Sequence, residues 1–305
     1  MFFYQPFTAA NWIMVVVFVI VVFFANEATR RSKWCAMAVF IVLPIFLTLF
    51  VWTHTAPRTI SEDWFLWVKV YSAVLGVIGA MAIRFIKRVE ESKFIYIFPP
   101  AILAINILQA VYREFEIFIR YSGITAINND LTITVGPWNL LNAIAGILTI
   151  VTITGWSGIQ VAKTKHRDIV WSDMTWLYII AYSLWNFAYV YNALPDRSLY
   201  SGLLILTTAA IANIFQKGSW LQHRGHILAM FAMFNLTFPA FAINSQFSVT
   251  ASESVIPNYT ISILSLAANV ALCVYMIYCM KKHNIKNPYT NEVFGHLYTN
   301  VSPKM

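Results

Sequence analysis

Charged residues are scarce in this chain: Asp, Glu, Lys and Arg make up only 11% of its 305 residues, against roughly a quarter in soluble domains. Hydrophobic residues account for 59%. This composition excludes an ordinary soluble domain, because too few charges are present to cover a water-exposed surface. We therefore expect a membrane protein that crosses the bilayer several times.

Cysteine is also scarce, with three residues in the chain. Cys35, Cys273 and Cys279 all lie in or at the edge of apolar runs, and no Cys-x-x-Cys pair occurs. An odd number of cysteines in apolar helices is not a disulfide framework, so we expect no structural disulfide.

The common catalytic and metal-binding motifs are absent from the sequence. It contains no P-loop, dinucleotide fingerprint, serine elbow or His-Glu-x-x-His. His223 and His226 are three residues apart in WLQHRGH, but a metal site needs more ligands than these two. We interpret this segment as a basic edge beside lipid headgroups. We assign the chain no catalytic residue, no metal and no cofactor.

Long apolar runs are abundant, and the connections between them are too short to hold a soluble domain. The runs predict an all-α transmembrane helix bundle of about nine spans over residues 1–285, with a short cytoplasmic tail over residues 286–305. The predicted spans cover residues 10–25, 35–53, 64–86, 94–118, 137–157, 172–194, 198–216, 223–243 and 258–280.

Lysine and arginine are unevenly divided between alternate connections: one set holds sixteen of the 21 basic residues and the other set holds four. Because cytoplasmic connections are enriched in Lys and Arg, this division predicts an outside N-terminus and a cytoplasmic C-terminus. It also accounts for the net charge of +8 without a nucleic-acid partner. The sixteen are Arg30, Arg31, Lys33, Arg84, Lys87, Arg88, Lys93, Lys163, Lys165, Arg167, Lys217, Arg224, Lys281, Lys282, Lys286 and Lys304; the four are Arg58, Arg113, Arg120 and Arg197.

A stripe of aromatic and polar side chains follows the uncharged segment Trp176–Asn192, WLYIIAYSLWNFAYVYN. Its members recur at steps of three and four residues, which puts them on one side of a helix. Polar groups are costly against lipid, so the stripe should face protein or water. It either packs between helices or lines a ligand cavity. Its members are Tyr178, Tyr182, Trp185, Asn186, Tyr189 and Asn192.

Amide side chains mark the neighbouring spans at the same outer depth. Asn106 and Gln109 share one face of the fourth span, and Asn139 and Asn142 share one face of the fifth. Hydrogen bonding between helices is the commonest role of such residues. Their agreement in depth with the aromatic stripe nevertheless favours a cavity that opens outwards.

Four charged residues at the outer side form a second candidate group. Arg113 and Glu116 are three residues apart on a helix and close enough to pair, whereas Glu114 points elsewhere. Lys69 lies inside the third span, where an unpaired lysine is costly. We expect Lys69 to pair with Glu114 or Glu116; the alternative is that these side chains reach out to interfacial water.

Four segments resemble a family of multi-spanning bacterial membrane proteins, one of the domain-of-unknown-function families. They are Trp67–Ser72 (WVKVYS), Gly136–Asn139 (GPWN), Leu184–Asn192 (LWNFAYVYN) and Trp220–Arg224 (WLQHR). The resemblance extends over nearly the whole chain. It implies a bacterial inner-membrane location and supplies no activity, substrate or catalytic residue.

These observations favour a transporter or channel for a small polar solute. A ligand-binding sensor or assembly partner is the alternative, and a membrane-embedded enzyme is a third hypothesis. The partners expected are the lipid bilayer and a small neutral or zwitterionic ligand, since no fixed charge is centred beside the stripe; the oligomeric state is left open. We expect a cavity of at least about 300 Å³. Its predicted lining is Tyr182, Trp185, Asn186, Tyr189, Asn192, Asn106, Gln109, Asn139 and Asn142.

The distribution of basic residues gives a prediction about orientation. A reporter fused after Met305 should be cytoplasmic, and a cysteine placed near Glu253 should react with an impermeant reagent in intact cells. Labelling of that position only after permeabilisation would reverse the orientation.

Overall fold

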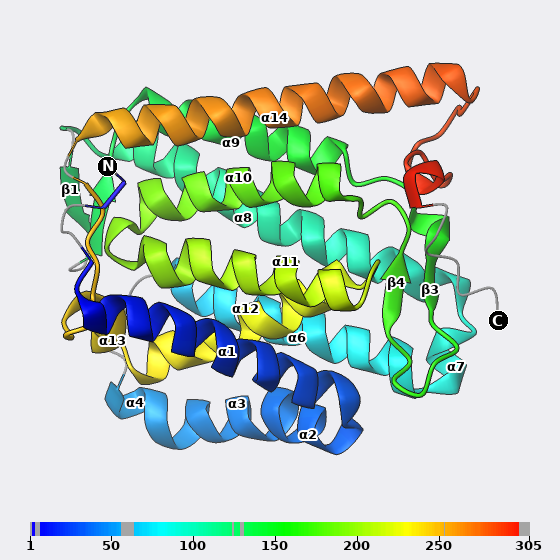
Figure 1. The fold of residues 1–305 in the computed structure, drawn as a ribbon, viewed down its shortest axis with the longest axis horizontal. Helices are drawn as coiled ribbons and strands as arrows, with labels where there is room; N and C mark the ends of the chain where they lie inside the picture. The colour runs from blue at the N-terminus through cyan, green and yellow to red at the C-terminus, as the bar shows by residue number, and fades with distance from the viewer. Residues whose placement is uncertain are drawn as a thin grey trace.

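A helix lies within each of the nine apolar runs, and the helices run alternately in opposite directions along an elongated bundle (Figure 1). The computed structural model describes residues 2–3, 7–55, 64–123, 125–128, 131–252 and 254–298. The residues outside this description include Arg58 and Glu253. They also include the tail beyond residue 298, with Lys304 and Met305. The elements are α1 (Ala9–Arg31), α2 (Lys33–Met37), α3 (Leu43–Phe46), α4 (Trp52–Thr55), α6 (Trp64–Phe85), α7 (Lys87–Glu90), α8 (Phe98–Arg120), β1 (Thr125–Asn128), β2 (Leu131–Thr134), α9 (Pro137–Val151), β3 (Ile159–Val161), β4 (Ile169–Trp171), α10 (Trp176–Ala193), α11 (Ile205–Phe215), α12 (Trp220–Thr237), α13 (Ala240–Ile243) and α14 (Val255–Lys282).

Six helical segments of the described chain are long and apolar enough to cross a membrane. The fold is therefore that of a helical membrane protein, and the finer prediction of nine spans goes beyond these six. α9 is apolar but shorter, and α10 and α12 are not among the six. The six segments are Ala9–Arg31, Lys33–Thr55, Trp64–Phe85, Phe94–Arg120, Pro195–Phe215 and Val255–Lys282.

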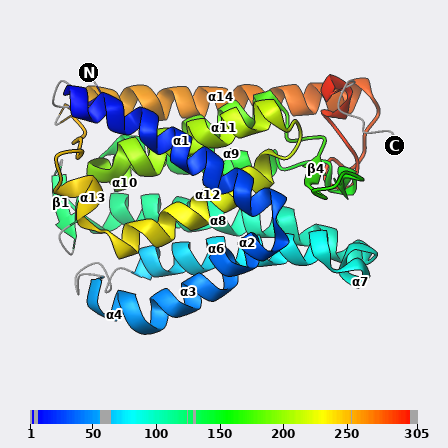
Figure 2. The same cartoon turned by 60° about the horizontal axis from the view of Figure 1, so that its bottom comes forward.

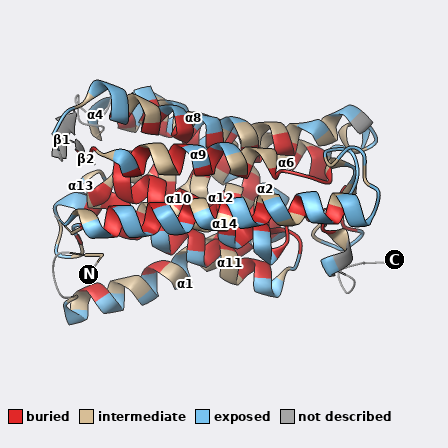
Figure 3. Ribbon diagram, turned by 90° about the horizontal axis from the view of Figure 1, so that it is seen from above, coloured by how far each residue is buried: buried red, intermediate tan, exposed pale blue. Residues whose placement is uncertain are grey.

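α10 lies at the centre of the bundle, which explains why it is less apolar than its neighbours. Figure 3 shows α10 buried along most of its length, while α14 carries exposed residues along one side. α10 packs against both α9 and α14. A helix enclosed by other helices can carry hydrogen-bonding side chains, because those groups meet protein instead of lipid.

Two predicted spans are interrupted at prolines. The second is divided by π-helical turns at Ala38–Val42 and Leu47–Val51, on either side of Pro44. The eighth ends as α12 at Thr237 and resumes as α13 after Pro239. A proline has no N–H to donate and crowds the carbonyl four residues earlier, so the regular helix cannot continue through it. Figure 2 shows α2, α3 and α4 on the outside of the bundle.

Each end of the bundle carries a two-stranded hairpin (Figure 1). β1 pairs with β2 in antiparallel register at the end where α1 begins, and β3 pairs with β4 at the end where α14 finishes. We call these the β1–β2 end and the β3–β4 end. A buried ionic cluster holds the second hairpin to the bundle, because Arg30 of α1 bonds Asp168 at 2.7 Å and Glu27 at 2.8 Å.

The first part of the predicted tail folds back on the β3–β4 end. Val293 and Phe294 are buried at 1% and 0% exposure. Their backbone N–H groups donate to Asp173, at 2.8 Å and 3.0 Å, and the Thr154 hydroxyl donates to the same carboxylate at 2.6 Å. Asp173 therefore binds the tail.

Asp173 lies before α10 begins, outside the helices. Burial raises the pKa of the Asp173 carboxyl above its ordinary value and nearby Glu292 adds to the rise, while the hydrogen bonds from Thr154, Val293 and Phe294 oppose it. The folded state therefore binds this proton more tightly than the unfolded chain. The contribution of Asp173 to folding stability is greatest at low pH and decreases as the pH rises from the ordinary carboxyl value through the raised one.

We predict that Asp173→Ala detaches the tail. Losing a carboxylate acceptor costs about 1.5–3 kcal/mol, so tryptic cleavage after Lys286 in the full-length protein should accelerate about tenfold or more. Asp173→Asn should have a smaller effect, because it keeps one acceptor oxygen and carries no buried charge. Glu91→Ala, at an exposed glutamate near the same end, is the control. Equal cleavage rates in the three variants would contradict this role of Asp173.

Candidate functional site

Glu114 of α8 is a fully buried carboxylate that accepts hydrogen bonds from amide side chains of two other helices. Asn139 Nδ2 donates to Oε2 at 2.5 Å. Asn142 Nδ2 and Asn192 Nδ2 donate to Oε1 at 3.0 Å and 3.5 Å. Among the described residues no lysine or arginine forms an ion pair with Glu114. Three amides thus take the place of a counter-ion.

The same amides continue the hydrogen bonding into α14. Asn258 Nδ2 donates to Asn192 Oδ1 at 2.9 Å, and Asn192 Nδ2 also lies 3.1 Å from Ser262 Oγ. Ser265 Oγ donates to Asn142 Oδ1 at 2.8 Å. α8, α9, α10 and α14 are therefore joined at the Glu114 site, and we call these residues the amide cluster.

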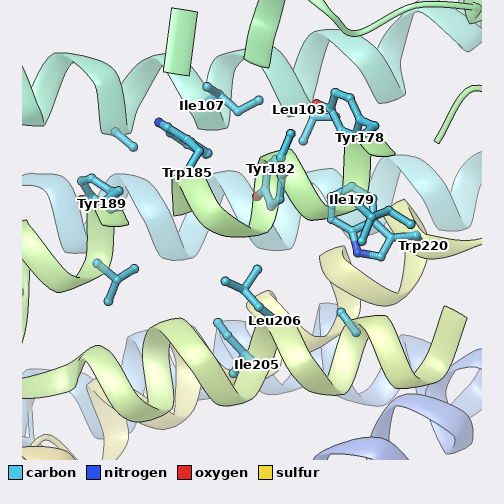
Figure 4. Close-up of a cluster of buried hydrophobic side chains, with 14 of the residues drawn as sticks. Leu103, Ile107, Tyr178, Ile179, Tyr182, Trp185, Tyr189, Ile205, Leu206 and Trp220 are labelled. Carbon is cyan, nitrogen blue, oxygen red and sulfur yellow. The ribbon is translucent and has the colours of Figure 1, made fainter. Parts of the chain in front are cut away.

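The aromatic stripe on α10 is continuous, but its members face different neighbours. Figure 4 shows Tyr182, Trp185 and Tyr189 following one another along the helix. Trp185 packs against α9 so closely that a Cβ on Gly146 would lie 2.6 Å from its Nε1 and 2.4 Å from Val111 Cγ2. Trp185 therefore packs closely against α9, next to Val111 of α8.

Lys69 does not pair as predicted. Its Nζ donates to the backbone carbonyl of Asn106 at 3.1 Å. Glu116 is instead held by Arg113 at 2.6 Å, and Glu114 by the amide cluster. The prediction failed because each carboxylate has another partner. Glu116 pairs with Arg113 on its own helix, and Glu114 accepts hydrogen bonds from amides of α9.

Asn106 and Gln109 of α8 contact α6 close to Lys69. The Ser72 hydroxyl lies 3.2 Å from Asn106 Oδ1 and 3.4 Å from Gln109 Oε1. The fourth predicted span thus contacts the third through these amides, one turn from Lys69.

Two small cavities lie beside α12, and Trp185 is in the lining of neither. The Gln222 cavity has a volume of about 80 Å³, and its lining includes Ser72, Asn106, Ile169, Tyr182 and Gln222. Residues at the starts of α8 and α12 and in β4 place it towards the β3–β4 end. Both cavities are smaller than the 300 Å³ expected from the sequence.

The Arg197 cavity, of about 70 Å³, lies towards the β1–β2 end. Residues near the start of α6, the end of α12 and the α10–α11 connection line it, among them Lys69, Asn186, Tyr189, Arg197 and Asn235. Arg224 and Leu228, one turn apart on α12, line both cavities. The Arg224 side chain therefore stands at the junction between them.

The predicted ligand residues divide into two groups. Asn106 and Tyr182 line the Gln222 cavity, and Asn186 and Tyr189 line the Arg197 cavity. The other predicted residues line neither cavity and make packing or hydrogen-bonding contacts between helices. They are Trp185, Asn192, Gln109, Asn139 and Asn142.

Arg224 is the main residue that sequence reasoning missed. It was assigned to a cytoplasmic connection, but it is 3% exposed, its Nη2 donates to Asn186 Oδ1 at 3.2 Å and its guanidinium lies 5.9 Å from the Tyr182 ring centroid. The sequence did contain a signal for this burial. Arg224 lies inside the predicted span 223–243, four residues before Leu228 and on the same helix face.

The two histidines beside Arg224 also differ from the interpretation. His223 and His226 are buried at 0% and 1% exposure, not at a lipid-facing edge. Their Nδ1 atoms lie 3.0 Å from Asn26 Nδ2 and 3.1 Å from Thr29 Oγ1 of α1. They join α12 to α1.

The amide cluster gives a prediction about stability. Glu114→Leu leaves the amides of Asn139 and Asn142 without their acceptor, at a cost of about 1–3 kcal/mol for each group. Glu114→Gln keeps one acceptor oxygen and should be milder. Thermal unfolding of the detergent-solubilised protein measures both. Glu91→Gln, at a glutamate whose side chain is 65% exposed, is the control; a Glu114→Leu variant as stable as this control would refute the role of the cluster.

A family model described as "Family of unknown function (DUF5692)" matches residues 5–302. No curated protein and no solved structure matches the chain.

Proposed function

The chain belongs to this family of unknown function, as the resemblance of its four segments indicated, and on that premise we propose that it is a membrane transporter or channel for a small polar solute. The observation that carries the proposal is that Arg224 and Leu228 line two cavities directed towards opposite ends of the bundle. A solute path needs such a succession of sites, with a polar group between them.

Irregular helices beside the cavities support a path. The segment Ser198–Leu204 is a π-helix, and it contributes Ser201 to the Arg197 cavity. α12 ends at Thr237 just beyond the same cavity. Interrupted helices at the depth of a binding site are a common feature of transporters.

The proposal includes a location and an orientation. In it, all nine helical runs cross the lipid bilayer of a bacterial inner membrane, with the N-terminus outside. The Arg197 cavity then opens towards the outside and the Gln222 cavity towards the cytoplasm. The positive connections at the β3–β4 end support this orientation.

The alternatives are less well supported by the same geometry. A sensor needs only one ligand cavity, so the second would have no role. An enzyme built on paired carboxylates would need Glu114 and Glu116 together, but Glu114 binds amides and Glu116 binds Arg113.

The proposal predicts that filling the Arg197 cavity blocks flux. In proteoliposomes, stopped-flow light scattering after osmotic shock should show faster entry of at least one of glycerol, urea, glycine or potassium nitrate (with valinomycin) than in protein-free liposomes. Ala232 lines the cavity, so Ala232→Phe should return that rate close to the protein-free value.

Val274→Phe is the matched control, because Val274 is 61% exposed on the outer face of α14 and the added ring points away from the path. Entry of all four solutes at the protein-free rate, or equal rates in the two variants, would contradict the proposal.

A further inference from the structure

Three cationic side chains line the Arg197 cavity: Lys69, Arg197 and Arg224. No aspartate or glutamate is among its described lining residues. Asp196, next to Arg197 in sequence, forms no ion pair with it within the described chain. The described lining therefore contains positive charge and no carboxylate, and Asp196 acts on Arg197 only through its electrostatic field.

The two arginines are buried and keep unused donors. Arg197 is 2% exposed and Arg224 is 3% exposed. In the described structure, Nε and Nη2 of Arg197 and Nε and Nη1 of Arg224 are buried without a hydrogen-bond partner. A buried charge whose donors are unused is strongly destabilising, so such donors call for an anionic partner.

The geometry of these donors favours an oxyanion. Nε and Nη2 form the edge of a guanidinium from which two N–H bonds point in parallel, matching two oxygens of a carboxylate, nitrate, sulfate or phosphate. Arg197 leaves this edge unpartnered. Arg224 is held in place by Asn186, which occupies Nη2, while its other donors stay unused.

Neutral groups complete the lining. Ser201 and Tyr189 contribute hydroxyls, and the Asn235 amide donates to Ser201 at 3.1 Å. Asn235 Oδ1 is an acceptor without a partner in the described structure, against four unpartnered N–H-bearing atoms of the two arginines. Donors thus outnumber acceptors.

We propose that the Arg197 cavity binds a small free oxyanion, held by the guanidinium groups of Arg197 and Arg224, with the Lys69 amine in the same lining. This inference rests on the proposed function and names the class of solute. It replaces the neutral or zwitterionic ligand expected from sequence, which assumed that no fixed charge stood beside the α10 stripe. A volume of about 70 Å³ fits nitrate, sulfate or phosphate and excludes a nucleotide.

Binding is tested on the full-length protein in dodecylmaltoside, in sodium gluconate, with nitrate, sulfate or phosphate replacing gluconate at constant ionic strength. The unfolding temperature, followed by tryptophan fluorescence, should rise saturably with at least one of the three anions. Arg197→Gln and Arg224→Gln should weaken the apparent affinity about tenfold or more, because each removes a charge-assisted hydrogen bond. Arg197→Lys keeps the charge but not the parallel N–H pair and should also weaken binding.

Arg120→Gln is the matched control: it removes the same charge from a side chain that is 69% exposed, outside the cavity. Sulfate and phosphate stabilise many proteins without binding, so an equal rise in all variants overturns the proposal, as does no saturable rise in the wild type. If the glutamine variants fail to fold, the wild type is tested directly by binding of radiolabelled sulfate and phosphate and by calorimetry with nitrate. Absence of saturable binding in these measurements overturns the proposal.

Two further arms separate the alternatives. Stabilisation by phosphatidylglycerol but by none of the free anions, with phosphatidylcholine as reference, identifies a lipid headgroup and overturns the free-oxyanion proposal. Oxyanion binding without flux of any solute supports the binding site and removes only the transport function. Flux of a neutral solute without oxyanion binding retains transport and overturns this inference.

Discussion

The burial of the Glu114 carboxylate is the constraint on which the arrangement of the central helices depends. A carboxylate without a cation inside a helix bundle must collect donors from several directions. Asn139 and Asn142 come from α9, and Asn192 comes from α10. Asn192 and Asn142 are fixed in turn by serine and asparagine side chains of α14. Rotating any one of these helices would break bonds to two others.

This constraint also decides which way α10 turns its remaining polar face. With Asn192 bound to the amide cluster and Trp185 packed on Gly146, Tyr182 and Asn186 are left to face α12 and the cavities. The two sides of α10 differ in kind. The amides of the cluster bond to Glu114 and to one another, whereas the arginine side leaves guanidinium donors unused.

The sequence predicted the helical runs well, because a run of apolar residues and its length are local properties. It also predicted the polar face of α10. It could not predict which helix each polar residue meets, since that depends on rotation and tilt about every helix axis. Lys69 was assigned to a carboxylate and instead binds a carbonyl of α8. Arg224 looked like a connection residue because it lies near the start of its run, but its long side chain reaches Asn186.

The contact between the tail and Asp173 also constrains how the protein is made. The amide of Val293 lies 120 residues further along the chain than the carboxylate it binds. The whole of α14 and the connection after it must therefore leave the ribosome and reach their places before this bond can form. Until then the Asp173 carboxylate lacks the two backbone donors of the tail. The contact that closes the β3–β4 end therefore requires an almost complete chain.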